Sequence, residues 1–161
     1  MFDGQKVSKS RVITSVDYSM VSMEAFEIYA ANHDIHVMDF VLKLDAYSYY
    51  MMNLLDYLIG NTDRHWGNWG FLVDNRTNQP VRLFDLMDLN QTFLAYDTPD
   101  GANCITTGNR KMSQREAAVE AVKNIGLNQK DEIKDEWFKG REEEREMFWC
   151  RFGILKEQCK A

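Results

Sequence analysis

The sequence contains few of the residues that mark specialised protein classes. Of its 161 residues, three are cysteine and two are proline. The cysteines are odd in number and form no C-x-x-C pair, so the sequence predicts neither a disulfide framework nor a zinc site. No run reaches the roughly 18 consecutive apolar residues that a membrane span requires. The polar residues 1–10 contain no apolar signal-peptide core. These absences favour a cytoplasmic protein with reduced thiols and no membrane partner.

An excess of positive charge is also lacking. The chain has 19 Lys and Arg against 25 Asp and Glu, a formal net charge of -6. Sequence-independent nucleic-acid binding needs a basic surface, so no direct nucleic-acid contact is expected. The hydrophobic fraction of 45% and the charged fraction of 27% are ordinary for a folded protein. A chain of this length suits one hydrophobic core and one globular unit.

Helical signals dominate the chain. Ser22 is a suitable N-cap, Asp45 can cap a further helix, and Gly60 is a suitable stop. Ser113 and Glu116 form an S-x-x-E capping box. The pattern predicts helices from Ser22 to about Asn32, over Val37–Leu44, from Asp45 to Gly60, from Ser113 to Gly126, and near Gln129–Lys139 and Arg141–Gln158. The charge run 141–146 is typical of a solvated helix face with intrahelical pairs.

Strand signals are few. Residues 69–73 and 81–84 are aromatic or β-branched, and the turn formers of 74–80 lie between them, so these segments predict a β-hairpin. A shorter β-prone run, 11–15, lies in a lead-in segment of residues 1–21, and 99–108 is expected to be a loop. The predicted fold class is mainly α with a small β-hairpin (α+β), in a domain covering 22–161.

The polar segment 60–70 lies between a predicted helix and a predicted strand, which is where catalytic groups are often placed. Within it, Asp63 and Asn68 have the D-x-x-x-x-N spacing of a kinase catalytic loop. In that loop the aspartate receives or orients the substrate hydroxyl, and the asparagine binds magnesium. Phosphoryl transfer needs an acceptor held in line and a neutralised phosphate charge, so a carboxylate and a hard oxygen ligand must converge on one pocket.

A second metal ligand is expected after the hairpin, at Asp88. Kinases place a metal-binding aspartate after a strand, and Leu89-Asn90 stands where D-F-G has Phe-Gly. Asp85 is a competing ligand three residues earlier, and the position of Asp88 against the motif favours Asp88. Asn90 is either a neighbour that supports the site or a turn residue. Magnesium is the natural metal for carboxylate, amide and phosphate oxygens.

Segment 58–70, together with Leu86-Met87-Asp88-Leu89-Asn90, resembles the catalytic and metal loops of the HipA-like serine/threonine kinases. The resemblance covers residues 36–94. It implies a mostly helical C-terminal lobe, Asp63 as the catalytic base, His65 as a support of the loop, and Asn68 and Asp88 as magnesium ligands. It further implies bound Mg²⁺ and ATP, with a serine or threonine hydroxyl of a protein substrate as acceptor.

The sequence differs from kinases in the elements that bind the phosphates of ATP. Kinases use a glycine-rich loop and a strand lysine, but the only glycine before Gly60 is Gly4, and no lysine has a V-A-I-K-like setting. Residues 1–21 are then a lead-in or the remnant of an N-lobe. A separate polypeptide supplies that lobe, or the chain is a fragment, or nucleotide binding has been lost. In the last case the chain is a pseudokinase-like remnant that binds a protein. A toxin component with an antitoxin-like partner is a further alternative.

Structural interpretations compete with the catalytic one. Asp and Asn are common in helix caps and turns, so Asp63 and Asn68 alone decide little. Their ordered combination with His65, Gly67 and Asp88 favours chemistry. Trp66 and Trp69 either stack on a ligand or pack as core, and packing is the commoner role of aromatics beside a tight loop.

Overall fold

The computed structural model describes residues 12–93, 98–108, 110–127 and 132–159. Its elements follow the order β1 (Tyr18–Ser22), α1 (Met23–Ala31), α2 (Val37–Leu58), β2 (Gly70–Asp74), β3 (Gln79–Leu83), α3 (Gln114–Ile125), a 3₁₀ turn η1 (Asp135–Phe138) and α4 (Glu142–Gln158). The expected α+β class is confirmed. None of the described helices is both long and apolar enough to cross a bilayer.

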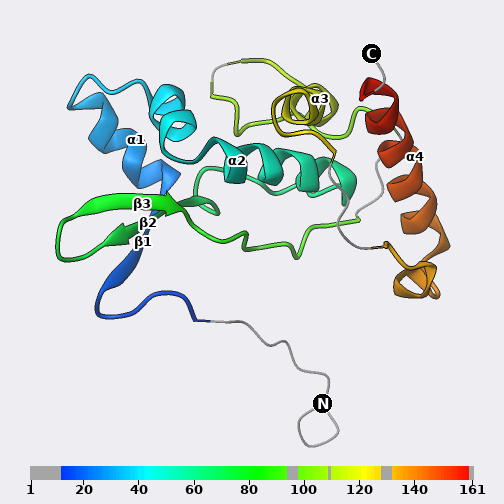
Figure 1. The fold of residues 1–161 in the computed structure, drawn as a ribbon, viewed down its shortest axis with the longest axis horizontal. Helices are drawn as coiled ribbons and strands as arrows, with labels where there is room; N and C mark the ends of the chain where they lie inside the picture. The colour runs from blue at the N-terminus through cyan, green and yellow to red at the C-terminus, as the bar shows by residue number, and fades with distance from the viewer. Residues whose placement is uncertain (1–11, 94–97, 109, 128–131, 160–161) are drawn as a thin grey trace, which may run out of the picture.

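The long helix α2 lies at the centre of the fold (Figure 1). The sheet and α1 contact it near one end, α3 packs along its opposite side, and α4 closes the far end. The buried side chains of these elements form one core. Its fully buried members include Met23, Val41, Tyr57, Phe71, Ala118 and Leu155.

The expected helix signals around α1 and α2 are confirmed. The Ser22 hydroxyl caps α1 by accepting the Ala25 N–H at 3.2 Å. Inside α2, Asp45 has non-helical dihedrals, and its Oδ1 accepts the Ser48 N–H at 3.1 Å, so it restarts the helix as a cap after a kink. The other carboxylate oxygen of Asp45 accepts the Leu83 N–H at 3.0 Å. One aspartate therefore shapes α2 and binds β3 to it.

The sheet has three antiparallel strands in the order β1-β2-β3, one more than the predicted hairpin. The prediction of β structure over 11–15 is wrong. Its described part, 12–15, is irregular, and the first strand is Tyr18–Ser22. Ser22 pairs with Gly70 at the start of β2. A Cβ on Gly70 would lie 2.1 Å from the Val21 carbonyl oxygen, so only glycine allows this close approach.

The C-terminal half differs from expectation in one element. The helix expected over Gln129–Lys139 is wrong in the described part, 132–139, which contains only the 3₁₀ turn η1; residues 129–131 lie outside the described residues. The helix near Arg141–Gln158 is confirmed as α4. Within the expected charge run, Arg145 pairs across to Asp135 of η1 at 3.0 Å.

The predicted capping box of α3 is confirmed. The Ser113 hydroxyl accepts the Glu116 N–H at 3.2 Å, and the Glu116 carboxylate accepts the Ser113 N–H at 2.7 Å. We expect Ser113→Ala to lower the free energy of unfolding by about 1 kcal/mol. Urea denaturation measures this loss, and an unchanged midpoint would contradict the role of the cap.

The same contacts give the cap a pH dependence. Hydrogen bonds from the Ser113 backbone and hydroxyl lower the pKa of Glu116 in the folded protein. Because the pKa of Glu116 is lower in the folded than in the unfolded protein, the stability that this carboxylate contributes is present at neutral pH. It is lost as the pH falls through the folded-state pKa.

Candidate functional site

The loop from α2 to β2 carries three of the predicted site residues and holds them together. The Asn68 side-chain N–H donates to the Asp63 carbonyl oxygen, and the His65 backbone N–H donates to the same oxygen at 3.0 Å. The Asn68 backbone N–H in turn donates to the His65 carbonyl at 3.1 Å. Asp63 is partly buried, His65 is exposed and Asn68 is buried. The segment between Asp63 and Asn68 is therefore one closed turn with both motif residues on it.

His65 takes part in this turn through its ring. Its Nδ1 accepts the Gly67 backbone N–H at 3.0 Å, which places the proton of the neutral ring on Nε2. A Cβ on Gly67 would lie 2.9 Å from the His65 Cε1 atom, so the ring packs closely over Gly67 and would have to shift to admit a larger residue. This contact lies within the loop, as a loop-supporting role requires.

A buried ion pair stands behind the loop. The Arg64 Nε lies 2.8 Å from Asp56 Oδ2, and its Nη2 lies 3.0 Å from Asp56 Oδ1. The two side chains are each 4% exposed. Charged residues are almost never buried to this degree unless they are paired, and the two-point geometry matches guanidinium to carboxylate. Asp56 thereby fixes the plane of the Arg64 guanidinium.

The third guanidinium nitrogen joins the two motif segments. Arg64 Nη1 donates to the Asn68 carbonyl at 2.9 Å and to the Met87 carbonyl at 2.8 Å. Met87 immediately precedes Asp88. Because one nitrogen binds both oxygens, the backbones next to Asn68 and Asp88 lie side by side although they are far apart in the sequence.

A second tether lies on the other side of Asp88. The Thr62 backbone N–H and hydroxyl both approach the Gln91 carbonyl, at 3.3 and 3.4 Å. Thr62 and Arg64 flank Asp63, while Met87 and Gln91 bracket Asp88 and Asn90. The structure therefore brings the segment of Asp88 against the segment of Asp63. Asp88 and Asn90 are exposed there.

Asp88 adopts a left-handed backbone conformation, with φ of 55°. Such a conformation is uncommon for a non-glycine residue and costs free energy that the surrounding contacts must offset. Asp85, by contrast, is exposed and pairs with Arg82 at 2.5 Å. Its carboxylate is thus already engaged by a cation, which favours Asp88 over Asp85 as a metal ligand.

The Asn68 side chain has one feature that a cation ligand would have. It is 3% exposed, and its Oδ1 is buried without a hydrogen-bond partner among the described residues. Its Nδ2 is committed to the Asp63 carbonyl, so the orientation of the amide is fixed. An unpaired buried oxygen is costly unless something binds it. An amide oxygen beside a segment that carries a carboxylate is a donor set suited to Mg²⁺.

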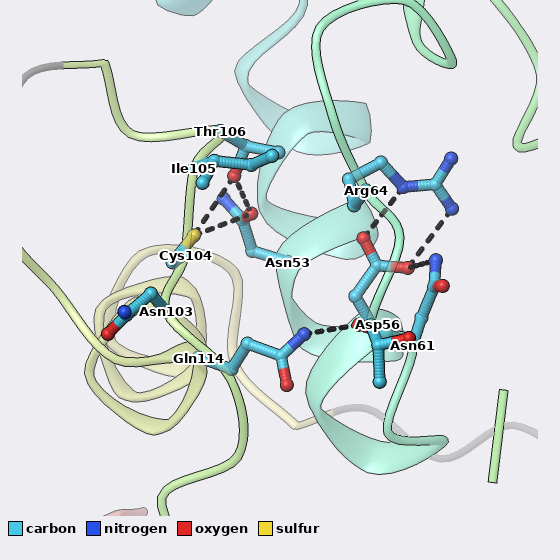
Figure 2. A pocket seen from close by; sticks show the side chains of 10 residues that line it. Asn53, Asp56, Asn61, Arg64, Asn103, Cys104, Ile105, Thr106 and Gln114 are labelled. Carbon is cyan, nitrogen blue, oxygen red and sulfur yellow. Dashed lines mark hydrogen bonds and ion pairs between the residues drawn. The ribbon is translucent and has the colours of Figure 1, made fainter. Parts of the chain in front are cut away.

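A small polar cavity of about 70 Å³ lies behind the loop (Figure 2). It is enclosed between α2, the loop and the start of α3, and its lining includes Asn53, Asp56, Asn61, Arg64, Thr106 and Gln114. Asn53 and Asp56 are both buried although they lie on a long helix with exposed residues. Asp56 binds the site loop, and Asn53 accepts a hydrogen bond from Thr106 in the segment before α3.

Sequence reasoning assigned no role to Asp56, Asn61, Arg64 or Gln114. The available signal was the pair Asn53 and Asp56, three positions apart in the largely apolar C-terminal part of α2. Trp69 is 4% exposed and packs in the core, as expected for a structural aromatic. Trp66 donates its indole N–H to the Ile105 carbonyl at 2.8 Å and so holds the loop against the segment before α3.

Comparison with protein-family models, with curated proteins and with solved structures finds no match to this chain. The function is therefore inferred from the sequence motifs and the geometry of the loop.

Proposed function

We propose that this chain is the C-terminal lobe of a HipA-like kinase, which transfers the γ-phosphoryl group of ATP to a serine or threonine hydroxyl of a protein. One observation carries the proposal. The Arg64 guanidinium binds the carbonyls of Asn68 and Met87 together. This contact supports a shared site for Asn68 and Asp88 beside Asp63.

In the proposed site each residue has a separate task. Asp63 orients the acceptor hydroxyl and takes its proton, and His65 braces the loop through Gly67. Asn68 and Asp88 would hold magnesium through amide and carboxylate oxygens, and Asn90 would support the nucleotide site next to Asp88. Bound Mg²⁺ would neutralise the phosphate charge that develops during transfer. The chain supplies positioning and one proton acceptor, which is most of what this reaction asks of a protein.

The proposal includes a partner for phosphate binding. The sequence shows no glycine-rich loop and no strand lysine, so we propose that an N-lobe in the same or another polypeptide covers the phosphates.

The binding-module alternative is favoured by a different observation. Ile28 and Tyr29 on α1 are 66% and 51% exposed. Large apolar side chains that are adjacent and exposed suit a protein partner. A chain that binds a partner through α1 without transferring phosphate would be the pseudokinase-like remnant. A toxin component neutralised by an antitoxin is a separate alternative.

Calorimetric titration with Mg-ATP tests the proposed metal site. We expect Asp88→Ala to weaken binding by more than about tenfold, because it removes a charged metal ligand. The matched control is Asp85→Ala, three residues away and also exposed, which should stay within about twofold of the wild type because its carboxylate pairs with Arg82. The titration is made with the N-lobe partner present if one is encoded nearby. Equal losses in both variants, or no binding by the wild type together with its N-lobe, would contradict the proposed site.

A further inference from the structure

Gln114, the first residue of α3, reaches the back of the site loop. It is 6% exposed. Its Nε2 donates to the Asn61 carbonyl at 2.5 Å (Figure 2). Its Oε1 accepts the Ala102 N–H at 3.1 Å. Because a donor and an acceptor meet opposite ends of the amide, the two partners also fix which end is nitrogen. Gln114 is thus a bridge between the segment before α3 and the loop after α2.

Asn61 carries this contact to Asp63. Asn61 is fully buried, and its backbone N–H donates to the Asp56 carbonyl at 2.9 Å. Its side-chain N–H donates to Asp56 Oδ1 at 2.8 Å, and its Oδ1 accepts the Asp63 backbone N–H at 3.2 Å. The backbone and side-chain polar groups of Asn61 are therefore all engaged once Gln114 binds its carbonyl. A change at that carbonyl acts on a residue that holds Asp63 directly.

The surrounding backbone is shaped to a glutamine at this position. Gly101 has φ of 71°, and a Cβ there would lie 2.5 Å from Gln114 Oε1. The Gln114 backbone N–H donates to the Ala102 carbonyl at 2.8 Å, and Asn103 forms a bridge with Ser113. The segment 101–103 therefore folds closely around the Gln114 amide and holds it facing Asn61.

From this geometry we propose that Gln114 is a positioning residue for Asp63. It satisfies the Asn61 carbonyl and so fixes the peptide that leads into the catalytic loop. Without the Nε2 donor, this buried carbonyl has lost its partner, and the Asn61 contact to the Asp63 N–H loosens. The catalytic consequence rests on the proposed function, whereas the effect on the loop backbone does not.

Two substitutions separate the donor from the rest of the side chain. Gln114→Glu keeps the length and the acceptor for the Ala102 N–H and, when ionised, removes the donor to Asn61. Gln114→Met keeps the length of the side chain and removes both the donor to Asn61 and the acceptor for the Ala102 N–H. We expect each variant to lower kcat by about tenfold with less than about twofold change in the KM for ATP. The peptide that leads into Asp63 is loosened, while the Arg64 contacts that hold Asn68 and the Asp88 segment remain. Gln79→Glu, an exposed residue of β3, is the matched control and should match the wild type.

The loop itself gives a readout that needs no turnover. Hydrogen exchange followed by NMR should show the Asp63 amide exchanging about tenfold faster in both Gln114 variants, with the amides of α4 unchanged. Rates and exchange are measured well below the melting temperature of each variant, so that loss of folded protein does not contribute.

The outcomes distinguish the two proposals. Unchanged exchange at Asp63 in Gln114→Glu overturns the positioning role, whether or not the wild type transfers phosphate. Faster exchange in a protein that transfers no phosphate supports the positioning role and contradicts the proposed function. Faster exchange with a selective loss of kcat supports both.

Discussion

Replacement of Asp63 by asparagine is expected to slow magnesium-dependent phosphoryl transfer by about a thousandfold. Asparagine keeps the size of the side chain but cannot accept the proton of the acceptor hydroxyl. The fold should survive, because the hydrogen bonds that hold this residue use its backbone. Its N–H donates to Asn61 Oδ1, and its carbonyl accepts from His65 and Asn68.

The measurement is transfer of phosphate from labelled ATP to protein hydroxyls, with the N-lobe partner present if a neighbouring reading frame encodes one. Asp85→Asn is the control, since it changes the charge by the same amount on an exposed side chain that pairs with Arg82. It should transfer phosphate at the wild-type rate. Equal rates for Asp63→Asn and the wild type would refute the role of Asp63.

Local signals predicted much of the fold because their physical causes are local. Ser22 and Ser113 cap helices through backbone groups three residues away. Asp45 caps within the next turn, and Gly60 ends a helix because its φ of 59° suits a residue without a side chain. None of these contacts depends on a distant part of the chain.

The errors in the fold lie where distant segments decide the structure. Residues 18–22 mix Tyr18, Met20 and Val21 with two serines, and they form a strand because β2 offers them an edge to pair with. Strand preference in such a segment reflects its neighbours more than its own residues. The expected helix near 129–139 has polar residues and good local propensity, but its described part contains only the turn η1, which places Phe138 against Phe148 of α4.

In the candidate site, too, the sequence predicted what depends on local pattern and missed what depends on distant contacts. The motif positions Asp63, Asn68 and Asp88 could be selected by spacing, because the chemistry itself prescribes an order of oxygen ligands. The residues that bring those positions together could not be selected by spacing. Arg64 binds Met87, and Gln114 binds Asn61, across separations at which no periodicity or turn signal operates. A buried arginine is identified only when its buried partner, Asp56, is seen.

Arg64 is expected to be the most costly residue of this group to remove. Arg64→Met should lower the free energy of unfolding by about 3–5 kcal/mol, since it leaves the Asp56 carboxylate buried without its cation. Two carbonyls, those of Asn68 and Met87, lose their donor in the same variant. Arg64→Lys should restore only part of the loss, because one ammonium group cannot reproduce the planar, two-point contact.

A matched pair on the surface gives the scale for this experiment. Arg82 and Asp85 also form a close ion pair but are 41% and 47% exposed, against 4% for each partner of the buried pair. Urea denaturation should show a loss of less than about 1 kcal/mol for Arg82→Met. Equal losses for Arg64→Met and Arg82→Met would contradict the buried pair as the support of the loop.

The double variant Asp56→Leu/Arg64→Met separates the two costs of losing Arg64. It removes the unpaired charge along with its partner, so it should be more stable than Arg64→Met alone. It should not recover the wild-type stability, because the carbonyls of Asn68 and Met87 still lack the guanidinium that joined them. The shortfall between the double variant and the wild type therefore reports the tether between the two motif segments together with the lost contact of the Asn61 side-chain N–H to Asp56. If the tether positions Asn68 and Asp88, binding of Mg-ATP should be weakened in this variant even at temperatures where it is fully folded.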